Sequence, residues 1–355
     1  MSLDALLPNL GEWLRGSGPE SDIILSTRIR LARNLSDIPF TSRAEAPQKA
    51  AVVRRVREAL AKAHLPYTLQ YHDLATLTPL DRQFLVERQL ISPELAAHQG
   101  PCGVAFDPRE SVSIMINEED HLRLQVLRSG FALEDAWQDI NQLDDALEAH
   151  LPYAFHPQFG YLTACPTNVG TGLRASVMLH LPALSLTRQL ERTLRAIQKI
   201  QLTVRGLHGE RSHALGDLYQ ISNQVTLGKP EPRILQELRE VIQIILAGER
   251  QARQLLLQEQ RHVEQNRVAR ALGTLGSATL ITAEETMELL SVVRLGIHLK
   301  LIDNIPTTVV NQLFIQCQAA HLQKIVGHTL DGEERNVARA RFLKDRLRQL
   351  GPQPS

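Results

Sequence analysis

Short apolar runs alternate with polar loops along the chain up to residue 228. The runs at 103–106 and 112–116 have the length and composition of buried strands, and similar runs lie at 23–25, 161–163, 175–181 and 201–204. Apolar residues recur at helical spacing over 48–65, 131–151 and 184–198, which predicts helices there. Strands that carry polar loops at their ends, with helices packed against them, indicate an α+β fold.

The pattern changes after the segment Gly228-Lys229-Pro230-Glu231-Pro232. From Ile234 onward the apolar positions follow helical spacing alone, over 235–268, 284–302, 307–326 and 333–350. The small residues at 273–278 predict a break between two of these helices. We therefore expect an all-helical C-terminal region behind the α+β part.

Composition and charge place the chain among ordinary globular proteins. The 39 basic and 39 acidic residues cancel, so nothing favours general binding to nucleic acid or to an anionic membrane. The three cysteines, Cys102, Cys165 and Cys317, have neither the spacing of a disulfide framework nor that of metal ligands. The chain shows no secretory signal and no apolar run near the roughly 20 residues of a membrane span. We expect a reducing, cytoplasmic location.

Five arginines stand at or near the ends of predicted strands. Arg28 and Arg30 are two positions apart, so in a strand their side chains share a face. Arg123, Arg174 and Arg205 follow other strands of the same expected sheet. A single arginine is more often part of a surface ion pair, but five planar guanidinium groups around one cleft suit a polyphosphate. Phosphoryl transfer depends mainly on such positioning and charge.

Acidic side chains and a thiol accompany these arginines. Glu118, Glu119 and Asp120 crowd a strand end, where acids repel one another and favour a bound cation. A guanidinium is a poor nucleophile, and Glu119 with Glu210 on a later loop could orient it and accept its proton. For Glu118 and Asp120, the alternative that they are solvated acids on the surface is at least as strong as a functional role. Cys165 precedes a proline near cationic groups, which favours a thiolate, although a buried inert cysteine is commoner.

Four motifs together resemble the phosphagen (guanidino) kinase family, and within it the bacterial protein-arginine kinases. They are Ser-Thr-Arg-Ile-Arg-Leu-Ala-Arg-Asn at 26–34, Asn-Glu-Glu-Asp-His-Leu-Arg at 117–123, Cys-Pro-Thr-Asn-Val-Gly-Thr-Gly-Leu-Arg at 165–174 and Ile-Ser-Asn at 221–223. The resemblance covers about residues 20–258 and implies an antiparallel sheet flanked by helices. It divides the chain into a catalytic domain, 1–258, and a helical dimerisation and phosphoarginine-binding domain, 259–355.

The resemblance also implies the chemistry of the site. ATP with Mg²⁺ would be the phosphoryl donor, without a resident metal site. The catalytic residues would be Glu119, Glu210 and Cys165. The ATP phosphates would be bound by Ser26, Arg28, Arg30, Arg123, Arg174 and Arg205.

Departures from the small-molecule members of this family favour the protein-arginine branch. Those enzymes have a helical domain before the Ser-x-Arg-x-Arg motif, which here begins at Ser26. Without such a domain, the side of the site that receives the phosphoryl acceptor would stay open, which suits an arginine carried by a protein. Met178 stands where those enzymes have a nucleotide-packing histidine, and Gln220 replaces an aspartate near their nucleotide site.

The C-terminal helices resemble the domain with which protein-arginine kinases dimerise and bind phosphoarginine. Its Arg-Asp-x-x-Arg-Ala pattern reads Arg-Asn-Val-Ala-Arg-Ala at 335–340 in this chain. Asp331 and Glu334 have the spacing of a capping box, and Arg335 and Arg339 would share one helix face. We expect an allosteric phosphoarginine site at Arg335, Asn336 and Arg339, with a plain solvated helix face as the alternative.

The resemblance implies a role in stress response and protein quality control. The kinase would mark arginine-bearing proteins for degradation by a Clp unfoldase–protease and control a heat-shock repressor, with an activating McsA-like zinc-binding adaptor and a homodimer. No direct binding to nucleic acid or membrane is expected. Two alternatives remain: a small-molecule guanidino kinase and a non-catalytic phosphoarginine-binding adaptor.

Overall fold

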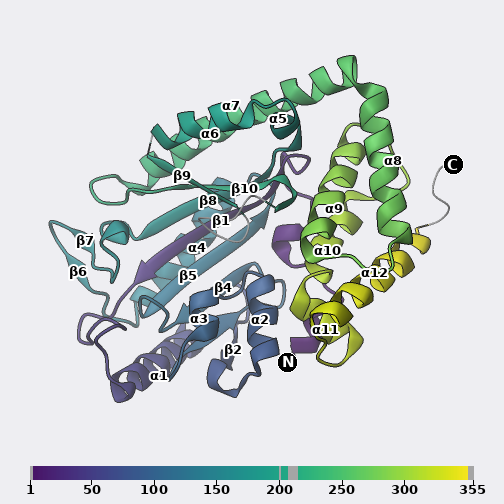
Figure 1. Ribbon diagram of the computed structural model, residues 1–355. Coiled ribbons are helices and arrows are strands. Elements are labelled where there is room, and N and C mark those ends of the chain that lie inside the picture. Colours follow the sequence, from purple (N-terminus) through teal and green to yellow (C-terminus); the bar gives the residue numbers. More distant parts are fainter. Residues whose placement is uncertain (1–2, 200, 207–214, 351–355) are drawn as a thin grey trace.

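The structure is a computed structural model that describes residues 3–199, 201–206 and 215–350. Within these ranges an antiparallel sheet of eight strands has the order β2-β3-β4-β5-β1-β8-β10-β9 (Figure 1). The strands are β1 (Ile24–Arg33), β2 (Gln70–Asp73), β3 (Gly103–Phe106), β4 (Val112–Ile116), β5 (Leu122–Ser129), β8 (Leu173–His180), β9 (Leu202–Gly206) and β10 (Leu218–Asn223). A separate hairpin joins β6 (Phe155–His156) to β7 (Gly160–Tyr161).

One face of the sheet is apolar and fully covered. Alternation along the strands turns Ile29, Leu124 and Val177 toward this face, where each is buried. The helices whose apolar residues join the same cluster are α1 (Ala46–Lys62), α4 (Leu133–Glu148), α5 (Pro182–Leu186), α6 (Leu190–Lys199) and α7 (Glu231–Glu259). The prediction of an α+β fold is confirmed.

The C-terminal region is helical and lies along one side of the sheet, from green to yellow in Figure 1. Its helices are α8 (Arg261–Ser277), α9 (Ala283–His298), α10 (Thr307–Gln316), α11 (Ala319–Val326) and α12 (Gly332–Arg348). The predicted capping box begins α12: Glu334 N donates to Asp331, and Asp331 N donates to Glu334, both at 2.9 Å. None of the helices in the described ranges has the length and apolar character to cross a membrane.

The helical region is fastened to the sheet region by buried polar contacts. Arg294 of α9 is fully buried and donates to the carbonyl oxygens of Ser21 at 2.7 Å and Asp22 at 3.1 Å. In helix α2 (Pro79–Glu87), the carboxylate of Glu87 accepts from the backbone N–H groups of Ala320 at 2.8 Å and His321 at 2.9 Å. Since backbone N–H groups at a helix start have no partner within the helix, this carboxylate caps α11 from another part of the chain.

Several elements differ from the sequence-based expectations. The small-residue stretch 273–277 continues α8, so the predicted break there was wrong; packing of Leu272 and Leu275 outweighs the helix cost of two glycines, about 1 kcal/mol each. The helix expected over 184–198 is divided at Arg188, whose φ is 59°. Strands β2, β5 and β10 and helices α2 and α3 (Pro93–Ala97) were not predicted. Most of them are short, and in the eight residues of β5 the polar Arg123, Gln125 and Arg128 interrupt the apolar run.

Candidate active site

Five arginines project from the sheet face opposite the apolar one. Strand alternation places Arg28 and Arg30 of β1, Arg123 of β5, Arg174 of β8 and Arg205 of β9 on this face, and all five line one cavity of about 1090 Å³. They lie within their strands, since β1 continues to residue 33, and not after the strand ends as expected. Arg30 pairs directly with Arg174 across β1 and β8. Like charges placed opposite each other destabilise a sheet unless an anion compensates them.

Arg28 is held by neutral groups. One guanidinium nitrogen donates to the side-chain oxygen of Gln89 at 3.3 Å and the other to that of Gln220. Burial, and then the charges of Arg123, Arg174 and Arg205, lower the pKa of Arg28 to about 9. Burial and neighbouring arginines likewise lower the pKa of Arg30. Amide oxygens orient the Arg28 guanidinium without cancelling its charge, so the cluster favours a polyanion.

Arg123 differs because it has a carboxylate partner. Its Nη1 donates to both oxygens of Glu118, at 2.6 Å to Oε2, and Ser92 Oγ donates to Glu118 Oε1 at 2.6 Å. Burial alone would raise the pKa of Glu118, but Arg123 and Ser92 outweigh it and lower that pKa. Glu118 is 8% exposed and therefore orients Arg123 from inside the protein. The reading of Glu118 as a solvated surface acid was wrong.

Asp120 and Glu119 have different surroundings. Asp120 is 3% exposed and accepts from Asn34 Nδ2 at 2.6 Å and from the backbone N–H of Ala164 at 2.7 Å, so it too is not a surface acid. Glu119 is exposed and lines the cavity. Partial burial, and then the negative charges of Asp120 and Glu118, raise the pKa of Glu119. A carboxylate of raised pKa at a cavity wall is suited to accept a proton.

The turn that carries Cys165 lies against the same cavity. Cys165 is partly buried, lines the cavity and has its Sγ 3.0 Å from Thr167 Oγ1. Thr226 Oγ1 donates to the carbonyl oxygens of Thr167 at 2.9 Å and Val169 at 2.7 Å, which fixes the turn. Gly172 has φ +66°, and a Cβ there would lie 2.6 Å from Arg33 Nη1 and 2.7 Å from a carbonyl oxygen. This position therefore requires glycine.

One predicted residue does not reach the cavity, and another falls in a part of the chain that the structure does not describe. Ser26 is 3% exposed and is not among the cavity-lining residues. Glu210 lies outside the described residues. Residues that the sequence reading missed include Gln89 and Ser92, which touch the arginine cluster. Gln89 has φ 59°, and no sequence signal marks this conformation for a glutamine.

The predicted phosphoarginine residues lie together on α12. Arg339 is 2% exposed; its Nε donates to Cys317 O at 2.7 Å, and its Nη1 donates to Ile281 O at 2.9 Å and to Asn336 Oδ1 at 2.7 Å. Arg335 Nη1 donates to Leu330 O at 2.8 Å. Arg339 is thus an oriented, buried group and not part of a plain solvated face, and Asn336 helps to hold it.

The matched families cover most of the chain. Residues 51–252 match the family "ATP:guanido phosphotransferase, C-terminal catalytic domain", and residues 261–355 match "Protein-arginine kinase McsB C-terminal domain". The curated protein-arginine kinase of Halothermothrix orenii is 49% identical over 98% of this chain and 99% of its own length. That of Symbiobacterium thermophilum is 47% identical over 94% of this chain and 96% of its own length.

Solved structures agree in fold. A lombricine kinase is 27% identical, with a TM-score of 0.59, over 66% of this chain and 68% of that one. The duplicated taurocyamine kinase of Schistosoma mansoni, at 24% identity, has a TM-score of 0.60 over 69% of this chain and 35% of that chain, which shows the shared fold alone. On these matches, the chain belongs to the protein-arginine kinases of the ATP:guanido phosphotransferase family.

Proposed function

We propose that this chain is a protein-arginine kinase that transfers the γ-phosphoryl group of ATP to a guanidinium nitrogen of an arginine in another protein. The observation that carries the proposal is the cavity in which five arginines of one sheet face meet Glu119 and Cys165. A polyanion and a guanidinium are the two ligands that these groups complement. Curated relatives that match nearly the whole chain carry the same name.

The arginines act as the phosphate-binding group of this proposal. Arg28, Arg30, Arg123, Arg174 and Arg205 hold the phosphates and stabilise the charge that moves to ADP as the Pγ–O bond breaks. Ser26 is buried in β1 and would act through the backbone of that strand and not through contact with ATP. Arg28 donates to the neutral amide oxygens of Gln89 and Gln220, which leave its positive charge for a phosphate and so support this role.

Magnesium enters the proposal with the nucleotide. Within the described ranges no group of three or more His, Cys, Asp or Glu side chains is arranged to hold a metal ion. Mg²⁺ commonly takes phosphate oxygens and water with few protein ligands, and this donor set fits an ion carried by ATP. When bound, the ion would neutralise part of the phosphate charge beside the arginines.

The acceptor guanidinium lies at the Cys165 end of the cavity. Glu119, together with Glu210, grips the guanidinium and takes the proton released as its nitrogen bonds to Pγ. The balance is one P–N bond formed, one P–O bond broken, ADP released and one proton transferred. Cys165 lies against the guanidinium and helps to orient it.

The wider role follows from the resemblance. The kinase would act in a cytoplasmic stress response, in which it marks proteins for degradation by a Clp unfoldase–protease and controls a heat-shock repressor. A zinc-binding adaptor would activate it. We divide the chain into a catalytic domain, 1–258, and a helical domain, 259–355, that supports a homodimer. The oriented guanidinium of Arg339 beside Arg335 supports a phosphoarginine site in the second domain.

Labelled ATP tests the proposal against its alternatives. The protein is incubated with γ-labelled ATP and either free arginine or an unfolded protein, with the Glu119→Gln variant as a matched control. Acid-labile label on the protein substrate alone supports a protein-arginine kinase. Label on free arginine alone would indicate a small-molecule guanidino kinase, and no label with retained phosphoarginine binding would indicate an adaptor.

A further inference from the structure

The cavity that holds the arginines extends to an end built partly by the helical region. Besides the sheet residues, its walls include Phe314 and Ile315 of α10 and Gln318, which precedes α11. Leu25 of β1 and Leu218 of β10 line the same cavity and belong to one apolar cluster with Phe314. Residues far apart in the sequence therefore enclose one end of the proposed ATP site.

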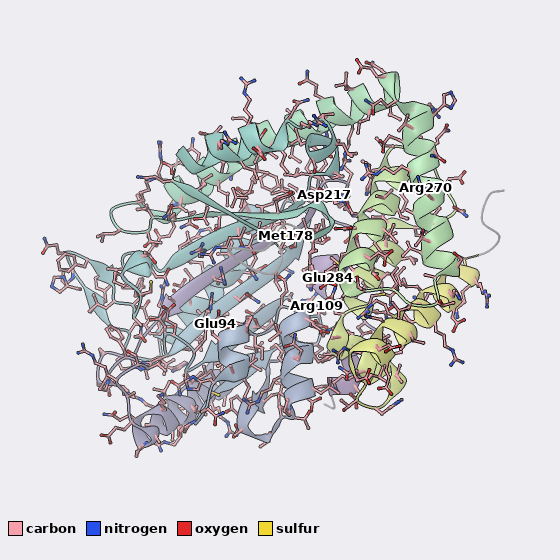
Figure 2. All side chains as sticks on the ribbon, in the orientation of Figure 1. Glu94, Arg109, Met178, Asp217, Arg270 and Glu284 are labelled. Atoms are coloured by element: carbon pink, nitrogen blue, oxygen red, sulfur yellow. The ribbon has the colours of Figure 1, made fainter. Side chains whose placement is uncertain are left out.

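This end is apolar where the middle of the cavity is cationic. Leu25, Leu218, Phe314 and Ile315 are each no more than 4% exposed, and all four belong to one apolar cluster with Met178. Figure 2 labels Met178 on β8 and Glu284 near the start of α9; this strand and this helix are in contact where His180 Nε2 lies 2.8 Å from Ser291 Oγ. Apolar walls with a few amide groups are typical of sites for flat heteroaromatic rings.

The apolar end begins directly beyond the arginines. Arg28 donates to Gln89 and Gln220, and both glutamines also line the cavity. Glu119 and Cys165 line it too, and they mark the acceptor side. A nucleotide whose phosphates lie on the arginines, with its γ-phosphate toward Cys165, directs its base toward Phe314.

The helical wall of the cavity, formed by Phe314, Ile315 and Gln318, is held in a fixed position relative to the sheet. Glu87 of α2 accepts from the N–H groups of Ala320 and His321, and Asn311 of α10 donates to Leu14 O at 3.1 Å. These contacts lie on either side of Phe314 and Gln318 in the sequence. The position of the wall is therefore set relative to the sheet before any ligand arrives.

We propose that the helical region binds the base of the nucleotide directly, with Phe314 and Ile315 as the apolar wall and the Gln318 amide at its edge. This inference rests on the proposed ATP-dependent function and adds a base subsite shared between the two regions. The family comparison alone does not imply it, because the matched catalytic family ends at residue 252.

Equilibrium binding of ATP and of inorganic tripolyphosphate separates the base from the phosphates. We expect Phe314→Leu and Gln318→Ala each to weaken ATP binding, and Phe314→Ala to weaken it about tenfold, as for the loss of one contact to a base. Tripolyphosphate binding should not change in any of them. Ile325→Ala, on an exposed position of α11, is the matched control and should bind both ligands as the wild type does.

The outcomes distinguish this inference from the proposed function. Wild-type protein that binds neither ligand would contradict the ATP site itself. Wild-type protein that binds tripolyphosphate as tightly as ATP would retain the arginine site but exclude a base subsite. Unchanged ATP affinity in both Phe314→Leu and Gln318→Ala, variants with small changes in packing, would also overturn the inference.

Discussion

A buried ion pair beside the helical region should be one of the most sensitive positions in the molecule. Arg88 and Glu110 have side chains that are each 1% exposed, and Arg88 Nε donates to Glu110 Oε2 at 2.8 Å while a second nitrogen donates to Oε1. Arg88 also donates to Asn9 O at 2.9 Å and lies 3.2 Å from His321 Nε2. The pair thus joins the N-terminal segment, the sheet region and α11.

Glu110→Gln keeps the shape of the side chain and leaves the Arg88 charge buried with neutral partners only. Removing one member of such a pair commonly costs about 3–5 kcal/mol, because the remaining charge stays desolvated. His321 offers no compensation: burial lowers its pKa, so its neutral ring donates from Nδ1 to Glu87 and accepts from Arg88 at Nε2. We therefore expect a loss of unfolding free energy of about 3 kcal/mol or more.

Urea unfolding followed by tryptophan fluorescence and far-UV circular dichroism measures this loss. Trp13, 4% exposed, lies close to Glu110 and reports on the same region. The control is Asp37→Asn, which breaks the exposed pair of Asp37 with Arg55 and should cost less than about 1 kcal/mol. The reasoning fails if Glu110→Gln costs as little as this control. It also fails if Arg88→Met and Glu110→Gln are additive in the double variant, since removing both charges should cost less than the sum.

Four further predictions concern the active site and the proposed phosphoarginine site. Arg174→Ala or Arg205→Ala should lower turnover by about 100-fold or more, measured by steady-state kinetics, and a near-normal rate in the double variant would remove both from the mechanism. Glu119→Gln and Glu210→Gln should nearly abolish phosphorylation while calorimetry still detects ATP binding; lost ATP affinity would instead indicate a structural role. Because the pKa of Glu119 is raised, its ionised form is lost as pH falls through that raised value, so the acid limb of kcat/KM should lie above the ordinary glutamate pKa of about 4.3. Asp120→Asn removes a negative neighbour and should move this limb to lower pH; an upward shift would contradict the assignment. Arg335→Ala should leave basal labelling intact and abolish both calorimetric binding of free phosphoarginine and any stimulation by it, with Arg339→Ala acting alike; binding that survives both changes would exclude this site.

The arginine cluster could be predicted because strand geometry is local. Two arginines two positions apart share a face in any strand, so Arg28 and Arg30 needed no knowledge of their neighbours. The capping box of Asp331 and Glu334 was predictable for the same reason, since its two residues lie within one helical turn. Both features depend on sequence separations of a few residues.

The parts of the site that were not predicted depend on distant partners. Asp120 is buried only because Asn34 and the Ala164 N–H reach it, and Glu118 only because Ser92 and Arg123 do. Nothing in the sequence next to Glu118 or Asp120 indicates that the carboxylate is buried, so both could be taken for surface acids. The helical wall of the cavity could not be predicted for the same reason, because Leu25 and Phe314 come together only in the folded chain.

The central place of β1 has a consequence for how the protein folds. This strand lies between β5 and β8, so Ala32 pairs with Arg123 and Arg30 pairs with Arg174. Contacts between residues so far apart form slowly, because long loops must close before the pairing stabilises anything. A growing chain at the ribosome can form helix α1 early, but it cannot assemble the arginine face until β8, β9 and β10 have been synthesised. The protein therefore acquires its complete anion-binding surface late in synthesis, and until then its most cationic strand, β1, can pair with β5 but not with β8.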